Sequence, residues 1–306
     1  MRAIVLGSGA GGGVPQWNCA CVQCRRARAG DPAVRPRTQA SLAVSADGAS
    51  WLLLNASPDL RQQIDATPAL HPRREPRDSP ISAVLLTGAE VDALGGLLTL
   101  REGQPWALYG QPAVHDVLAA NPIFGVLDPG KVPCRALALD TPTGIADAHG
   151  EPLGLVIEAF AVPGKAPRYR EAEAGTAIAA DGASAVRVRP AGGGASLVFM
   201  PGCAAIDETV RAHLDGTDVA FVDGTLYRDD ELIRAGLGDK TGRRMGHVSM
   251  TGTDGVVERL ADLAIGQRIF VHVNNSNPAL AADSPERAAL AAAGWTVAED
   301  GLEITL

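Results

Sequence analysis

Three of the five cysteines in the chain lie within six residues, at Cys19, Cys21 and Cys24, directly behind a glycine-rich segment. Three thiolates this close together hold a zinc ion most economically, because a soft tetrahedral cation accepts crowded sulfur donors. The alternative is three unrelated buried thiols, or a disulfide with a spare cysteine. A Cys-x-Cys pair does not easily bridge to itself, and nothing in the sequence indicates secretion. The spacing therefore predicts a structural zinc site.

The bulk composition indicates a globular protein that acts neither on nucleic acid nor in a membrane. Of its 306 residues 46% are hydrophobic, enough for a large core, and the formal net charge is −8. No cluster of lysine and arginine indicates a nucleic-acid surface, and no apolar stretch reaches the length of a membrane span. Met1-Arg2 runs straight into an apolar segment, so we expect no signal peptide and a cytoplasmic, reducing location. We expect Cys134 and Cys203 to be ordinary small buried residues.

Short apolar runs bounded by turn residues predict strands along the whole chain, with helical patterns between them. The expected strands cover residues 3–7, 41–45, 51–55, 83–87, 155–162, 196–200, 219–223 and 269–273. The expected helices cover residues 57–66, 92–101, 113–120, 208–214, 231–235, 255–263 and 285–293, and a hairpin loop is expected at 190–194. Strands come in pairs before the first helix, which favours two sheets covered by helices over an alternating Rossmann pattern. No linker is long enough to divide the chain, so we expect one domain over residues 1–306.

The glycine-rich segment over residues 7–13 superficially resembles a phosphate-binding turn. It lacks the Lys-Ser/Thr pair of a P-loop, and no helical pattern follows it. A nucleotide site is therefore disfavoured. We expect the glycines instead to let the loop fold tightly around the metal or approach a ligand closely.

A series of motifs resembles, in the same order, the coenzyme PQQ biosynthesis protein B family, which belongs to the metallo-β-lactamase-like superfamily. The motifs are GSGAGGGVPQWNC over residues 7–19, LNASPD over 54–59, GGLLTLREG over 95–103, DGT over 223–225, TGRRMGH over 241–247 and HVNNSNP over 272–278. The resemblance spans nearly the whole chain. It implies an αββα sandwich of two mixed sheets flanked by helices, as in tRNase Z and a cyclic phosphodiesterase of phosphonate breakdown.

The superfamily's metal motif, His-x-His-x-Asp-His, corresponds to the segment over residues 87–96. Gly88 stands where the first histidine would be, Glu90 where the second would be and Ala93 where the last would be, so only Asp92 is retained. The PQQ family itself lacks the first two histidines but usually keeps the last, and Ala93 therefore weakens the case for metal chemistry. A dinuclear hydrolase needs more ligands than these, so we expect no hydrolysis of the superfamily type.

By the resemblance, Glu90, Asp92 and His272 remain as a three-donor set for an active-site metal. His272 ends an apolar strand, where the superfamily has its final ligand. One imidazole with two carboxylates would suit Fe(II) or Mn(II). The alternative is structural: Glu90 would cap or solvate a helix start, and Asp92 would be an N-terminal helix residue favoured by the helix dipole.

Two further residues are candidates for catalysis. His247 follows Arg243 and Arg244 in a loop, where related enzymes use a histidine near the reacting group, and Asp223 ends a strand beside the expected site. The two arginines indicate an anion-facing pocket, and with Lys165 they are the expected contacts for substrate carboxylates. A hydrogen-bonding or surface role for His247, and a turn-forming role for Asp223, remain open alternatives.

The zinc site needs a fourth donor. In the phosphodiesterase relatives, a histidine three residues after the final active-site histidine completes it, and Asn275 stands at that position here. An amide oxygen is a poor zinc ligand, so the fourth donor could be Asn275, His272 drawn away from the active site, or water. One histidine cannot serve both sites.

The resemblance implies a role in making the quinone cofactor PQQ, as an iron-dependent hydroxylase of a tyrosine- and glutamate-derived precursor. His247 would then shuttle protons. The competing hypothesis, which Ala93 favours, is a carrier that holds PQQ or its precursor without catalysis and needs only the structural zinc. The expected partner is a small or peptide-derived precursor, with no nucleic acid and no membrane, and a homodimer is left open.

Overall fold

Within residues 1–74, 76–175 and 177–306, which the computed structural model describes, the chain forms two seven-stranded sheets. In spatial order, the first sheet contains β14 (Glu303–Thr305), β1 (Arg2–Gly7), β2 (Ser41–Ser45), β3 (Trp51–Leu54), β4 (Ile81–Leu86), β5 (Ala107–Gly110) and β6 (Cys134–Ala136). The second contains β13 (Trp295–Val297), β12 (Gln267–Val271), β11 (Val219–Asp223), β10 (Leu197–Met200), β9 (Ala179–Pro190), β8 (Pro152–Gly164) and β7 (Thr143–Ala146). Each sheet is mixed: β3 to β6 and β10 to β13 are parallel, whereas the other neighbouring strands are antiparallel.

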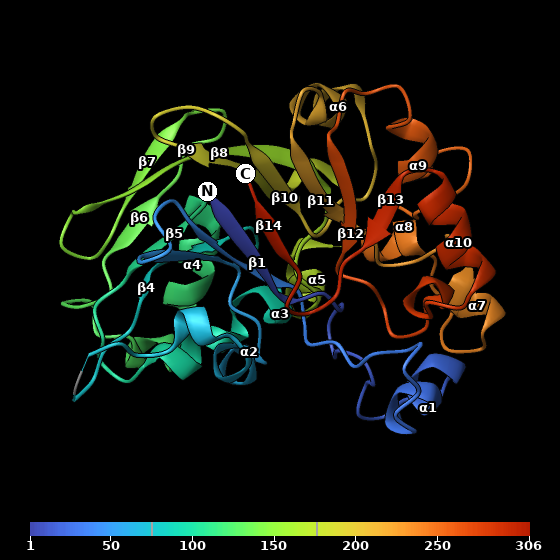
Figure 1. Ribbon diagram of the computed structural model, residues 1–306, viewed down its shortest axis with the longest axis horizontal. Helices are drawn as coiled ribbons and strands as arrows, with labels where there is room; N and C mark the ends of the chain where they lie inside the picture. The colour runs from blue at the N-terminus through green and yellow to red at the C-terminus, as the bar shows by residue number, and fades with distance from the viewer. Residues whose placement is uncertain (75, 176) are drawn as a thin grey trace.

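Helices cover the outer faces of both sheets (Figure 1). The α-helices are α1 (Val22–Arg28), α2 (Leu60–Ala66), α3 (Val91–Leu94), α4 (Pro112–Ala120), α5 (Glu171–Ala174), α6 (Glu208–Leu214), α7 (Glu231–Arg234), α8 (Gly242–Met245), α9 (Val256–Arg259) and α10 (Pro285–Ala292). The 3₁₀-helices are η1 (Pro68–Leu70), η2 (Gly95–Leu100), η3 (Pro122–Val126), η4 (Arg168–Arg170) and η5 (Pro278–Leu280). Helices α2 and α4 pack on the first sheet, and α6, α9 and α10 pack on the second. The predicted αββα sandwich is therefore confirmed.

The core between the sheets follows from the alternation of side chains along the strands. Leu42 and Leu54 of the first sheet belong to the same buried cluster as Phe199, Phe221 and Val271 of the second. Neighbouring residues on the same strands, such as Leu53, point to the outer helices instead. Burial on both faces explains why these strands read as continuous apolar runs in the sequence.

The predicted strands all appear, with ends that shift by a few residues in places, and β9 and β10 form a hairpin around the expected loop at 190–194. The prediction of one continuous α-helix over residues 92–101 is wrong. Only α3 is α-helical there, and residues 95–100 continue as the 3₁₀-helix η2. Gly96 lies so close to the preceding loop that a Cβ would come within 2.1 Å of the Ser57 carbonyl oxygen, which accounts for the glycine.

Other helix boundaries and one cysteine also differ from expectation. The helix expected from residue 57 begins at Leu60, and the one expected over 255–263 contains only Val256–Arg259. Cys203 is buried as predicted, whereas Cys134 is exposed because it lies on the edge strand β6. Among the described residues, no helix combines the length and the hydropathy that crossing a membrane requires.

Candidate functional site

The three clustered cysteines lie in the loop between β1 and α1 and at the start of that helix. Their sulfur atoms lie within 4.8 Å of one another. The side-chain amide of Asn275 faces all three, with its Nδ2 atom 3.1 Å from Cys19 Sγ, 3.6 Å from Cys21 Sγ and 3.3 Å from Cys24 Sγ. Because the two ends of an asparagine amide are interchangeable in assignment, the oxygen can equally face the sulfur atoms. The three thiols therefore form a donor set that suits a zinc ion, and the Asn275 side chain lies beside them where a fourth donor would be.

The cysteine thiols differ in how readily they ionise. Burial raises the pKa of the Cys24 thiol to about 11. Burial also opposes ionisation of Cys21, but hydrogen bonds from the Cys24 backbone and from the Cys19 and Asn275 side chains outweigh it and lower the pKa of Cys21. A cation bound here would stabilise all three thiolates at once, which is the usual chemistry of a zinc–thiolate site.

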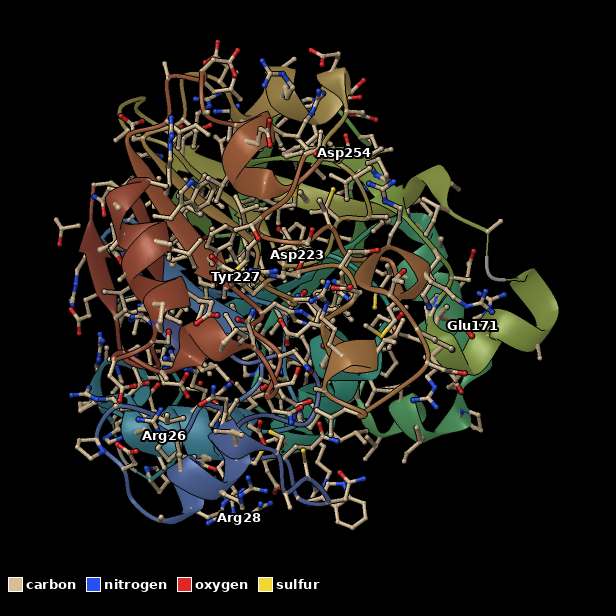
Figure 2. The ribbon with its side chains drawn as sticks, turned by 90° about the vertical axis from the view of Figure 1, so that its right-hand side faces the viewer. Arg26, Arg28, Glu171, Asp223, Tyr227 and Asp254 are labelled. Carbon is tan, nitrogen blue, oxygen red and sulfur yellow. The ribbon has the colours of Figure 1, made fainter. Side chains whose placement is uncertain are left out.

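Arginines of α1 hold this cysteine loop in shape. Arg28 donates to the carbonyl oxygens of Gln16, Trp17 and Cys19. Arg26 pairs with Asp31 at 2.7 Å and with Asp283 at 2.8 Å, and these hydrogen bonds raise its pKa. Figure 2 shows Arg26 and Arg28 on α1 at the lower edge of the molecule, with Asp223 nearer the centre. Sequence reasoning missed the arginines, which carry no motif of their own.

A second group of functional side chains lines a cavity of about 990 Å³. Its walls come from the glycine-rich segment after β1, the start of α3, the β8–β9 connection and the segment around α7 and α8. Its polar lining consists of Gln39, Asn55, Thr87, Glu90, Asp92, Lys165, Arg168, Tyr169, Glu171, Ser184, Thr225, Asp239, Lys240, Arg244, His247, His272 and Asn274. Gly11 and Gly12 line the cavity as well, so the segment that leads to the cysteines also borders this site.

His272 follows β12 in a left-handed conformation, with φ = 60°. Its Nε2 atom lies 2.8 Å from Asp92 Oδ2, and its Nδ1 atom lies 2.9 Å from Thr225 Oγ1. Asp92 is in the first turn of α3, so it reaches His272 from the opposite sheet. Burial disfavours the charged form of the His272 imidazole, but the hydrogen bond to Asp92 and the negative charge of Asp92 outweigh burial and raise the pKa of His272. The two residues form a buried pair.

His247 and Asp223, the last residue of β11, form a second histidine–carboxylate pair. His247 Nδ1 lies 2.7 Å from Asp223 Oδ2, and the carboxylate also accepts hydrogen bonds from the backbone N–H groups of Cys203 and Thr225, both at 3.0 Å. Burial raises the pKa of Asp223, but the charge and hydrogen bond of His247 outweigh this and lower it. The rings of His247 and His272 stack with centroids 5.1 Å apart. Two histidine–carboxylate pairs therefore lie side by side at the cavity, with Asp223 buried behind His247.

The predicted three-donor set is only partly assembled. Asp92 and His272 come together, but the Glu90 carboxylate accepts the backbone N–H of Arg168 at 3.4 Å instead. Burial, reinforced by the charge of Asp92, raises the pKa of Glu90. Among the described residues, the potential ligands that cluster at this site are Asp223, His247 and His272. Glu90 therefore lines the cavity without joining the cluster.

Only two of the three predicted substrate-binding cations lie at the cavity. Lys165 and Arg244 line the cavity, and Lys165 pairs with Glu171 at 2.5 Å. Arg243 does not line it: its guanidinium lies 3.3 Å from Asp254, in a separate surface depression. Helix α8 is a single turn, so consecutive residues point about 100° apart and only one of the two arginines can face the cavity. Lys240 and Arg168 are further cavity cations that sequence reasoning missed.

Comparison with known proteins identifies the family. A family model described as "Beta-lactamase superfamily domain" matches residues 50–273. The chain is 53% identical to coenzyme PQQ synthesis protein B of Gluconacetobacter diazotrophicus over 99% of this chain and 98% of the relative, and 53% identical to that of Methylobacterium sp. over 100% of both. The chain belongs to the coenzyme PQQ synthesis protein B family.

Solved structures agree with this membership of the coenzyme PQQ synthesis protein B family. The zinc-bound crystal structure of PqqB from Methylobacterium extorquens matches with a TM-score of 0.93, at 49% identity and with full coverage of both chains. A diphosphatase of the PhnP family (TM-score 0.67, 20% identity, 100% of this chain and 97% of the other) and human short-form tRNase Z (0.61, 14%, 100% and 99%) share the fold. In this chain, Gly88 and Ala93 line the cavity, and neither carries a metal-binding side chain.

Proposed function

We propose that this chain acts in the synthesis of coenzyme PQQ by binding a precursor in the cavity over Asp92 and His272 and oxygenating it with bound iron. Membership of the family supports the role in PQQ synthesis. The observation that carries the site is the pair of histidine–carboxylate contacts at the cavity, His272 with Asp92 in its lining and His247 with Asp223 buried behind it. Buried pairs of this kind are typical of sites that bind a metal or move a proton.

The donor chemistry supports a mononuclear metal. Asp92 and His272 offer one carboxylate and one imidazole, a set that suits Fe(II) or Mn(II) and is too small for a dinuclear zinc hydrolase. When bound, iron would supply the activation of dioxygen, of which one oxygen atom would enter the ring of a dihydroxyphenylalanine-like precursor and the other would leave as water. The catechol itself would supply the two electrons and end as the hydroxylated quinone. Glu90 stays outside the proposed ligand set because its carboxylate is engaged with the Arg168 backbone.

His247 is the proposed proton acceptor for the substrate. Its Nδ1 atom is held by Asp223 Oδ2 at 2.7 Å, which leaves Nε2 as the free nitrogen of the ring. A carboxylate in this position fixes the tautomer and stabilises the imidazolium that forms when a proton is accepted. A phenolic proton of a tyrosine-derived precursor is the kind of proton that it would take.

The cations around the cavity are the proposed partners of carboxylates on the precursor. Lys165, Arg168, Lys240 and Arg244 come from two different walls of the cavity. Arginine forks bind carboxylates in a bidentate manner, which would orient the precursor as well as attract it. The net charge of −8 would not steer an acidic precursor, so recognition is assigned to these local cations.

The cysteine cluster is proposed to hold a structural zinc through Cys19, Cys21, Cys24 and Asn275. The thiol spacing and the position of the amide support this set, and a zinc-bound relative makes zinc the natural ion. A zinc at this point would tie α1 to the loop that follows β12, because Asn275 belongs to that loop.

A second candidate function, a carrier of PQQ or its precursor without catalysis, is favoured by one observation. Ala93 lines the cavity next to Asp92, where a histidine would add a further nitrogen ligand. A carrier needs the cavity and its cations but no redox-active metal.

One experiment separates the two candidates. The full-length protein is loaded with Fe(II) without oxygen, given a dihydroxyphenylalanine-like precursor and then exposed to oxygen. The catalyst predicts an oxygenated product that depends on iron, and a His247→Gln variant should bind the precursor but form little product. Precursor binding with no oxygenated product from the iron-loaded wild type would remove the oxygenase and leave the carrier.

A further inference from the structure

Thr225 is the point at which the two histidine–carboxylate pairs meet. Its hydroxyl oxygen lies 2.7 Å from Asp223 Oδ1, 2.9 Å from His272 Nδ1 and 3.0 Å from His247 Nδ1. The side chain is buried, at 4% exposure, so water does not replace these contacts. The proposed function assigns no role to the Thr225 hydroxyl.

The number of hydrogens decides which way these bonds run. A hydroxyl has one hydrogen to donate and two lone pairs to accept with. Two of its neighbours can only accept, the Asp223 carboxylate at 2.7 Å and the His272 carbonyl oxygen at 3.2 Å. The carboxylate is nearer and charged, so the Thr225 hydrogen points to Asp223 Oδ1. Both lone pairs of Oγ1 are then left for the imidazoles. A ring nitrogen that faces a lone pair at hydrogen-bond distance must carry a hydrogen.

The same reasoning applies to the other contacts of Asp223. Its oxygens accept from the Cys203 and Thr225 backbone N–H groups, from the Thr225 hydroxyl and from His247 Nδ1. Each of these neighbours is therefore a donor when the carboxylate is ionised. The Nδ1–H of His247 is fixed directly by Asp223, and that of His272 is fixed through Thr225.

The backbone around Thr225 leaves the hydroxyl little freedom. A Cβ on Gly224 would lie 2.9 Å from Phe270 Cβ and 3.1 Å from the Val271 carbonyl oxygen, so the turn is packed tightly against β12. The Thr225 carbonyl accepts the backbone N–H of Asn274 at 3.0 Å and the Asn277 amide at 3.3 Å. These hydrogen bonds fix the position of the turn at Thr225 relative to the loop that contains His272.

We infer that Thr225 is a positioning residue that relays the charge of Asp223 to His272, so that both imidazoles carry hydrogen on Nδ1. Without metal, Nε2 of His272 donates to Asp92, and a metal would take the place of that hydrogen, whereas Nε2 of His247 is left for the substrate. For His272, this makes Nε2 the nitrogen that binds iron, and to that extent the inference rests on the proposed function. The hydrogen-bond relay itself belongs to the protein without metal.

The first test is nitrogen-15 NMR of full-length protein labelled at histidine, with iron withheld and zinc retained. The wild type should show a hydrogen on Nδ1 of both His247 and His272. In Thr225→Val, which keeps the shape but removes the hydroxyl, His272 should lose the hydrogen on Nδ1 and keep the one on Nε2 that Asp92 accepts, while His247 keeps its own. Thr225→Ser should restore the hydrogen on Nδ1 of His272. An unprotonated Nδ1 on either histidine of the wild type would overturn the inference without any variant.

The second test is Fe(II) affinity, measured on the same proteins without oxygen. Thr225→Val should bind Fe(II) about 10- to 100-fold more weakly than the wild type, and Thr225→Ser close to the wild type. An Nδ1 hydrogen on His272 and an iron affinity that both survive in Thr225→Val would refute the relay. If the wild type binds no iron, the iron site of the proposed function fails, but the NMR result still decides the role of Thr225.

Discussion

His272 and Asn275 lie three residues apart in one loop and face two different sites. His272 Nε2 lies 2.8 Å from Asp92 Oδ2 on the cavity floor, whereas Asn275 Nδ2 lies 3.1 Å from Cys19 Sγ in the cysteine cluster. The loop after β12 therefore joins the expected structural zinc to the cavity. His272 is held in the cavity by Asp92 and Thr225 and is not drawn toward the cysteines.

Cys21→Ser should lower the zinc content and loosen α1, because metal binding and local folding are coupled. Zinc measured in protein purified without added metal, together with hydrogen exchange over residues 16–30, checks both effects. Cys134→Ser is the matched control, since Cys134 is exposed and lies outside the cluster. Full zinc content in Cys21→Ser would argue against the site.

Ala93→His should raise the affinity for Fe(II) by about tenfold or more, because it adds a nitrogen ligand next to Asp92 in the cavity wall. Ala93→Leu adds similar bulk without a ligand and should bind Fe(II) no better than the wild type. Anaerobic titration of both variants gives the comparison. Equal affinities in the two variants would mean that the metal lies elsewhere.

Glu231 should make stability fall as the pH rises. Burial raises the pKa of Glu231 to about 7, even though its carboxylate accepts from Ser276 Oγ at 2.6 Å and Tyr227 N at 2.7 Å. A carboxyl whose pKa is higher in the folded state than in the unfolded state favours folding when protonated. Its contribution to the free energy of unfolding is therefore fully present below the pKa of the unfolded state and is lost as the pH rises through the pKa of the folded state. Between about pH 5 and about pH 8 the loss is roughly 2–3 kcal/mol.

Urea unfolding at about pH 5 and about pH 8 measures this effect. Glu231→Gln should be more stable than the wild type at the higher pH and should lose less stability between the two. Glu151→Gln, at an exposed turn, is the control and should keep the wild-type dependence. A Glu231→Gln protein with the same pH dependence as the wild type would contradict the argument.

Asp300→Ala should destabilise the fold by about 3 kcal/mol or more, because it leaves buried donors without an acceptor. The carboxylate accepts from the backbone N–H and hydroxyl of Ser8, at 2.9 and 2.7 Å, and from those of Thr38, at 2.7 and 2.8 Å. It thereby connects the C-terminal end of the chain to the segments after β1 and before β2. Thermal unfolding of Asp300→Ala measures the loss of stability. Asp116→Ala is the control, because Asp116 is exposed and its replacement should leave stability nearly unchanged.

The parts of the fold that depend on local pattern could be predicted from the sequence. The eight apolar strands and the cluster of three cysteines are short-range signals. The family motifs indicated that Asp92 and His272 share one site and that Asn275 lies near the cysteines, although these residues are distant in sequence. The helix over 92–101 could not be predicted correctly, because its 3₁₀ continuation depends on contact between Gly96 and the Ser57 carbonyl.

The parts of the site that depend on long-range contacts could not be predicted. Glu90 is engaged by the Arg168 backbone, on a connection 78 residues further along the chain. The Thr225 hydroxyl contacts His247 and His272, 22 and 47 residues further along the chain, and only the tertiary fold brings these rings to it. The direction of Arg243 depends on the rotation of a one-turn helix, which the order of the two arginines does not fix.

The most direct test of the account is the metal content of the full-length protein after anaerobic loading with Fe(II) and removal of weakly bound metal. We predict one tightly held zinc and one iron in the wild type, and zinc without iron in Asp92→Asn. The central claim would be contradicted by a wild type that holds zinc alone, or by an Asp92→Asn protein that holds as much iron as the wild type.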